Sequence, residues 1–82
     1  MIGPTWSRAP LPWRASLGAV IVGTESGEPV LEGSTAVVWE LLARPLPTAE
    51  VVSQAREAYG LDAPATTAAL DALAASGLCR ST

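Results

Sequence analysis

The chain has 82 residues, a length that favours one domain, and 49% of them are apolar, which is enough for a single core. The net charge is −3, with five arginines and no lysine, so the surface is poorly suited to the phosphate backbone of a nucleic acid. The single cysteine, Cys79, excludes a disulfide scaffold within the chain, and no apolar run is long enough to span a bilayer. We therefore expect a cytoplasmic protein without a membrane partner.

The first segment, residues 1–12, contains three prolines and little periodicity. It is expected to be an extended arm that precedes a single domain over residues 13–82. The indoles of Trp6 and Trp13 are expected to cover the core of that domain.

The next segment, residues 13–32, is rich in strand-forming residues. Residues 13–17 and 19–23 predict two strands with Gly18 near their turn, because "AVIV" is apolar and largely β-branched. "TESGE" predicts a second turn, and "PVLE", residues 29–32, predicts a short third strand. Pro29 has no N–H to donate, which favours the edge of the sheet for this strand.

The rest of the chain predicts three helices. Ser34 is expected to cap the first, which runs to about Ala43, and Thr48 to cap the second. The second is expected to bury Val52, Ala55 and Tyr59 on one face.

The third predicted helix begins after Asp62, with Pro64 in its first turn, and it directs Leu70 and Leu73 into the core. "YGLD" and "SGLC" both predict a helix that ends at a glycine followed by an apolar contact. The predicted order is β-β-β-α-α-α, an α+β arrangement of the winged helix-turn-helix type.

Residues suited to catalysis are scarce. The chain has no histidine, which removes the commonest general base and metal ligand, and Cys79 lacks a histidine to activate it. Glu25, Glu28 and Glu32 flank the third strand, where solvated turn charges are a better interpretation than a weak cation site. We expect no enzymatic activity, no cofactor and no metal.

The third helix also argues against DNA binding. It carries no Arg, Lys, Asn or Gln to read base edges, and its one charge, Asp71, is negative. Its many small residues suit a shallow groove for another backbone, or they reflect the high helix propensity of alanine. The residues alone leave these two interpretations open.

Three blocks in order resemble the PqqD-like proteins, which are recognition elements for precursors of ribosomally synthesised, post-translationally modified peptides. The blocks are "LEGSTAVVWELL", "PTAEVVSQAREAYGLD" and "TTAALDALAASGL". The matching positions, which span much of residues 20–78, are Leu31, Ala36, Val38, Trp39, Leu41, Leu42, Thr48, Val51, Val52, Tyr59, Leu70, Leu73, Gly77 and Leu78. The chain departs from the family pattern at Glu32, Thr35, Ala65 and Ala69, which concerns the identity of the ligand rather than the fold.

The resemblance implies a peptide chaperone that binds the leader of a precursor peptide. The leader would add as a strand to the edge of the third strand beside the third helix, and Trp39 would lie in the core. The partner would be a maturation enzyme such as a radical SAM enzyme, a cyclase or a leader peptidase. The implied contact residues are Glu28, Pro29, Val30, Leu31, Glu32, Thr66, Thr67, Leu70, Asp71 and Ala74.

Two alternatives to leader binding stay open at this point. One is a winged-helix module that binds nucleic acid, and the other is a docking module for a protein partner. A free strand edge also permits a homodimer through edge-to-edge pairing.

Overall fold

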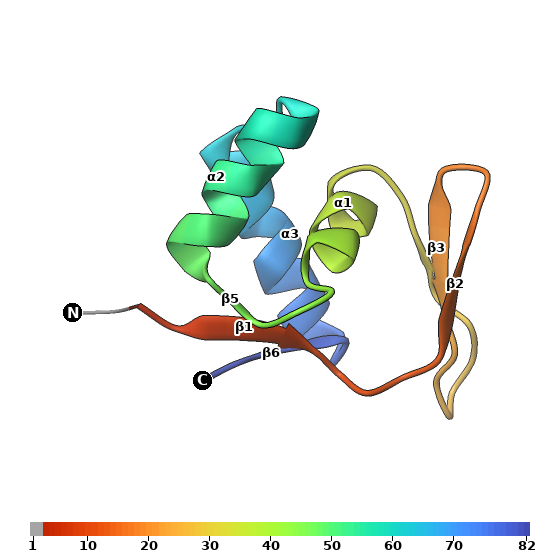
Figure 1. Ribbon diagram of the computed structural model, residues 1–82. Coiled ribbons are helices and arrows are strands. Elements are labelled where there is room, and N and C mark those ends of the chain that lie inside the picture. Colours follow the sequence, from red (N-terminus) through yellow and green to blue (C-terminus); the bar gives the residue numbers. More distant parts are fainter. Residues whose placement is uncertain (1–2) are drawn as a thin grey trace.

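The computed structural model describes residues 3–82, which form three helices and two small antiparallel sheets (Figure 1). The elements in chain order are β1 (Thr5–Arg8), β2 (Trp13–Ser16), β3 (Ala19–Val22), β4 (Val30–Leu31), α1 (Ser34–Leu41), β5 (Leu46–Pro47), α2 (Thr48–Tyr59), α3 (Ala63–Ala75) and β6 (Cys79–Ser81). The α+β class is confirmed. The predicted order β-β-β-α-α-α is wrong in detail, because β1 precedes it, β5 lies between its first two helices and β6 follows it.

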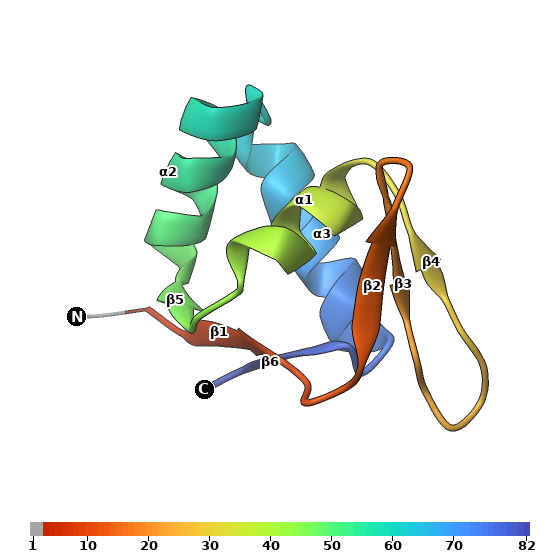
Figure 2. The same ribbon diagram turned by 45° about the vertical axis from the view of Figure 1, so that its right-hand side comes forward.

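The sheet β2-β3-β4 matches the three strands predicted for residues 13–32. Val20 and Val22 of β3 are buried and lie on the face that meets α1. Leu17 and Gly18 form the turn between β2 and β3 with φ of +49° and +82°, the left-handed values of a two-residue hairpin loop. β4 lies at an edge of the sheet, as Pro29 predicted (Figure 2).

The second sheet, β5-β1-β6, joins the two ends of the described chain (Figure 1). In β1, Trp6 lies opposite Leu46 of β5 and Ser81 of β6. Residues 5–8 are therefore part of a sheet, whereas the sequence predicted only an extended arm; Met1 and Ile2 lie outside the described residues. Strands of two to four residues beside prolines carry little periodic signal, and their pairing joins segments far apart in the chain.

The helix starts differ from the prediction at two of three places. The N-cap residues of α1 and α2 are Gly33 and Pro47, and neither has a side-chain cap. Ser34 is thus the first helical residue rather than a cap, and so is Thr48, whose Oγ1 instead accepts a hydrogen bond from Trp6 Nε1 at 2.8 Å. Asp62 caps α3 as predicted, with its carboxylate accepting from the Ala65 N–H at 2.9 Å.

Both predicted glycine stops are confirmed. Gly60 and Gly77 have φ of +66° and +74°, which glycine adopts without strain. After Gly77, the N–H of Leu78 donates to the Leu73 carbonyl at 2.9 Å, which is the Schellman bond, and Leu78 is buried.

The core lies between α1, α3 and the inner face of the hairpin sheet. Trp39 is fully buried at its centre, and Leu70 and Leu73 of α3 are buried as predicted. The buried face of α2 carries Val51 and Ala55, an i, i+4 pair. Ala55 is buried as predicted, whereas Val52 is half-buried and Tyr59 is exposed, so the buried face differs from the predicted one at these two positions.

Arg8 of β1 connects the two sheets to α1. Its guanidinium carbon lies 4.6 Å from the centre of the Trp13 ring and 5.1 Å from that of Trp39. Arg8 Nε donates to the Trp39 carbonyl at 2.6 Å and Nη2 to the Glu40 carbonyl at 3.2 Å. A cation therefore satisfies carbonyls at the last turn of α1, where the helix dipole favours positive charge. Trp13 remains 40% exposed and so covers the core only in part.

The cap of α3 is expected to contribute measurably to stability. Asp62→Ala removes the acceptor for the Ala65 N–H and should lower the free energy of unfolding by about 1 kcal/mol. Urea titration of the wild type and the variant measures the difference. Asp71→Ala is the control, because it removes an exposed carboxylate of the same helix and should change stability by less than about 0.5 kcal/mol. Equal effects of the two substitutions would contradict the capping role.

Candidate functional site

The main-chain groups of Val30 lie on the open edge of β4. Ile21 lies opposite Val30, and the N–H of the next residue, Val22, donates to the Pro29 carbonyl at 3.1 Å. In an antiparallel pair, bonded and non-bonded positions alternate, so Val30 occupies a non-bonded position. Its N–H and C=O therefore point away from β3. No strand within residues 3–82 pairs with that side of β4.

The side chains around β4 alternate between two faces. Leu31 points inward and is 8% exposed, packed in the core. Val30 points outward and is 56% exposed, and Glu28 and Glu32 share its parity and are exposed. Of the five residues predicted on this strand, Leu31 alone has its side chain in the core. Leu31 therefore anchors β4 to the core.

Two neighbouring contacts limit what this edge can offer. The Glu28 carboxylate lies 3.4 Å from Arg14 Nη1, with both side chains more than 60% exposed, so the pair is weak. The Glu32 carbonyl already accepts a hydrogen bond from Thr35 Oγ1 at 2.8 Å. Val30 is consequently the residue of β4 itself whose main-chain donor and acceptor both face outward.

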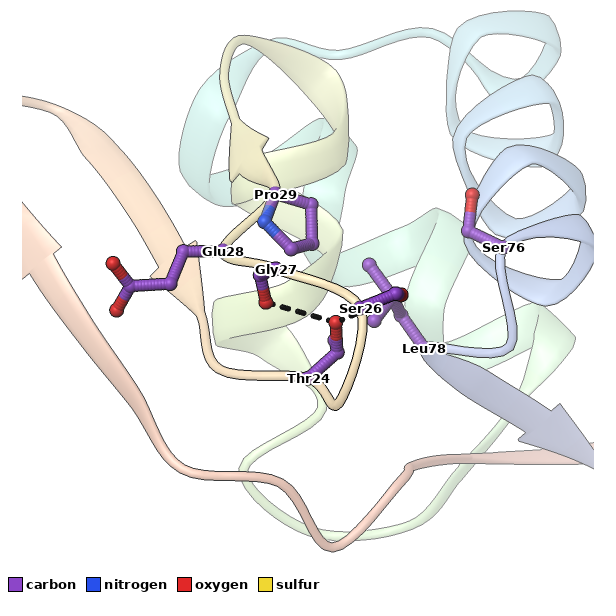
Figure 3. A pocket seen from close by; sticks show the side chains of 7 residues that line it. All are labelled: Thr24, Ser26, Gly27, Glu28, Pro29, Ser76 and Leu78. Atoms are coloured by element: carbon purple, nitrogen blue, oxygen red, sulfur yellow. Dashed lines mark hydrogen bonds between the residues drawn. The ribbon is translucent and has the colours of Figure 1, made fainter.

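A concavity of about 450 Å³ lies beside this edge (Figure 3). One wall is the turn before β4, where Thr24 Oγ1 donates to the Gly27 carbonyl at 2.8 Å. The other wall is the end of α3. The lining residues are Thr24, Ser26, Gly27, Glu28, Pro29, Ser76 and Leu78. Sequence reasoning placed Glu28 and Pro29 at the site and missed the other five, which belong to "TESG" and "SGL", segments identified only as a turn and a helix stop.

The residues predicted on α3 divide by burial. Thr67, Asp71 and Ala74 are exposed. Thr66 and Leu70 are 0% and 1% exposed, which corrects their assignment as side-chain contacts. Thr66 Oγ1 donates to the Asp62 carbonyl at 3.0 Å within the helix, and Leu70 belongs to the core. The exposed surface of α3 is made of small side chains and one carboxylate.

The chemistry available to these groups is limited to hydrogen bonding, packing and charge. Within residues 3–82, no cluster of three potential metal ligands occurs, and no helix has the length and apolar character needed to cross a membrane. Cys79 is buried in the core, opposite Arg8 in the β1–β6 pair. Burial raises its pKa from 9.0 to about 11, and the positive charge of Arg8 offsets only part of that rise. The thiol is therefore protonated at neutral pH and is a poor nucleophile.

The raised pKa of Cys79 predicts a stability change at alkaline pH. The unfolded chain loses the thiol proton near pH 9 and the folded chain near pH 11, so stability should fall as pH rises through this window. Urea unfolding at pH about 8.5 and about 10.5 should show a larger loss for the wild type than for Cys79→Ala. Equal losses in the two proteins would contradict this prediction.

Comparisons of the chain with the sequence signatures of known protein families, with curated protein sequences and with solved structures gave no match. The candidate site is defined by the geometry of this chain itself. It consists of the open edge of β4 at Val30, the concavity between the preceding turn and the end of α3, and the exposed small side chains of α3.

Proposed function

We propose that the protein is a non-catalytic peptide-binding module of the PqqD-like kind, built on a variant of the winged helix-turn-helix. It binds the leader of a ribosomally made precursor peptide as an added strand on β4. The observation that carries this proposal is the outward-facing N–H and C=O of Val30 on an unpaired edge. An open strand edge is a ready template for another chain.

The surroundings of β4 offer a bound peptide more than main-chain pairing. The concavity begins at Glu28 and Pro29, directly before β4, and reaches the end of α3. No residue of β2 lines it. A peptide paired with Val30 therefore has a second surface to contact beside the end of α3.

The chemistry of the site suits binding followed by presentation. Main-chain hydrogen bonds supply affinity without a demand on the leader's sequence, and the small exposed side chains of α3 let a backbone lie close. Hydrogen bonds and packing are sufficient for binding and presentation, so the chemical modification of the precursor peptide belongs to a separate maturation enzyme. The module works in the cytoplasm, where precursor peptides are made.

Leader binding is tested by a titration with the labelled leader of a precursor peptide encoded beside this protein. We expect saturable binding at roughly micromolar affinity, worth about 8 kcal/mol. Val30→Pro removes an outward N–H while sparing the bonds to β3, and edge strands accept proline. The variant should fold and bind the leader about tenfold or more weakly, because the lost hydrogen bond and the bulk of the ring both oppose pairing.

Ala15→Pro provides a matched control on the opposite edge. The Gly23 N–H donates to the Pro12 carbonyl at 2.8 Å, so Ala15, three residues on, occupies a non-bonded position with its N–H facing the open side of β2. This variant should bind the leader as the wild type does. Normal binding by a folded Val30→Pro, or equal weakening by both substitutions, would overturn the assignment to β4.

A further inference from the structure

Three acidic residues flank the open edge of β4, within a long part of the chain that contains no arginine or lysine. Seven of the eight acidic residues lie in residues 15–43 and 57–79, and neither segment contains an arginine or lysine. In the first segment Glu25, Glu28 and Glu32 flank β4, whereas Glu40 belongs to α1. The second segment contains Asp62 and Asp71 at α3, together with Glu57 at the end of α2. Arg14 of β2 lies opposite Ile21, which lies opposite Val30, and its Nη1 is 3.4 Å from the Glu28 carboxylate in an exposed ion pair.

The outer face of β4 places these charges in a fixed order. Glu28 and Glu32 lie two residues before and after Val30, just outside β4, and all three side chains are exposed. Continuing the alternation of β4 to these two neighbours places an apolar residue between two carboxylates on the outer face. Ile21 lies opposite Val30 on β3 and extends the apolar patch inward across the sheet. In residues 3–82, no ion pair involves Glu32.

An added antiparallel strand would meet this pattern in a defined register. One residue of that strand exchanges both main-chain bonds with Val30, and its side chain lies beside Val30 on the outer face. The residues two positions before and after it lie opposite Glu32 and Glu28. The intervening residues project to the inner face, on the side of the sheet where Leu31 meets the core.

From this register we infer that the strand accepted by β4 is cationic. Its central residue is β-branched or apolar, and basic residues stand two positions before and two positions after it. In one-residue steps the pattern is basic, apolar, apolar, apolar, basic. The inference rests on the proposed function and adds the chemical class of its ligand. An acidic strand would place like charges opposite one another, which is destabilising.

Two capped seven-residue peptides test the inference. One contains Lys-Leu-Val-Leu-Lys between terminal glycines, and the other has Glu in place of both Lys. Each is titrated into the ¹⁵N-labelled protein at low salt while the amide signals are followed by NMR. The Lys peptide should bind about fivefold or more tightly than the Glu peptide, since each cross-strand ion pair contributes about 1.5- to 5-fold. Its largest shifts should fall on Val30 and its neighbours.

Glu32→Lys should reduce or reverse the preference between the two peptides. Glu57→Lys is the matched control, with the same change in net charge on an exposed residue of α2, on the far side of the molecule from β4 (Figure 2). It should leave the preference unchanged. High salt should weaken the Lys peptide selectively, because the two carboxylates are exposed.

The outcomes separate the ligand class from the function itself. Suppose that the Lys peptide binds no more tightly than the Glu peptide and that Val30→Pro abolishes the binding of both. The cationic class of the ligand is then overturned, while strand addition to β4 is still supported. Failure of the Lys peptide to shift the Val30 amide, with normal leader binding, would also overturn it. If Val30→Pro weakens the binding of neither the two peptides nor the leader, the proposed function fails as well.

Discussion

The placement of Arg8 between two indoles is the contact on which the arrangement of this small protein depends. Trp13 comes from the hairpin sheet, Trp39 from α1 and Arg8 from the other sheet, so one guanidinium joins all three. Its two hydrogen bonds to the last turn of α1 make the contact directional as well as attractive. A chain of this length buries a limited apolar surface, which increases the weight of such a contact.

This junction sets the orientation of the open edge. Trp13 meets Trp39 edge-on, with ring centres 6.1 Å apart, and the inner face of the hairpin sheet closes over α1. Leu31 is anchored in the same core, so β4 is held from its inner side. The opposite side of β4 is left unpaired, next to the turn that forms one wall of the concavity. A rigid, preorganised edge loses less entropy when a peptide binds.

The proposed ligand follows from combining this geometry with the distribution of charge. Strand pairing alone would accept almost any extended peptide, because it reads the main chain. The two carboxylates that flank Val30 on one face add a preference that pairing cannot supply. Specificity then depends on a small number of exposed side chains, which tolerate substitution without disturbing the core.

The local features of the chain were determined by its sequence. The β-branched run before Gly23 predicted a strand, Pro29 predicted an edge position, Asp62 predicted a helix start, and Gly60 and Gly77 predicted helix ends. Each of these signals acts through a residue's own backbone preferences or through hydrogen bonds a few residues away.

Other features were decided by the tertiary structure. The sheet β5-β1-β6 pairs segments from both ends of the chain. The Thr48 hydroxyl accepts a hydrogen bond from the Trp6 indole instead of capping its own helix. Thr66 and Leu70, which the family resemblance implied as contact residues of α3, are buried. The outward direction of the Val30 N–H depends on the register of β4 against β3, and a shift of one residue would reverse it. Long-range pairing and register are set by how the elements pack together, which no local pattern encodes.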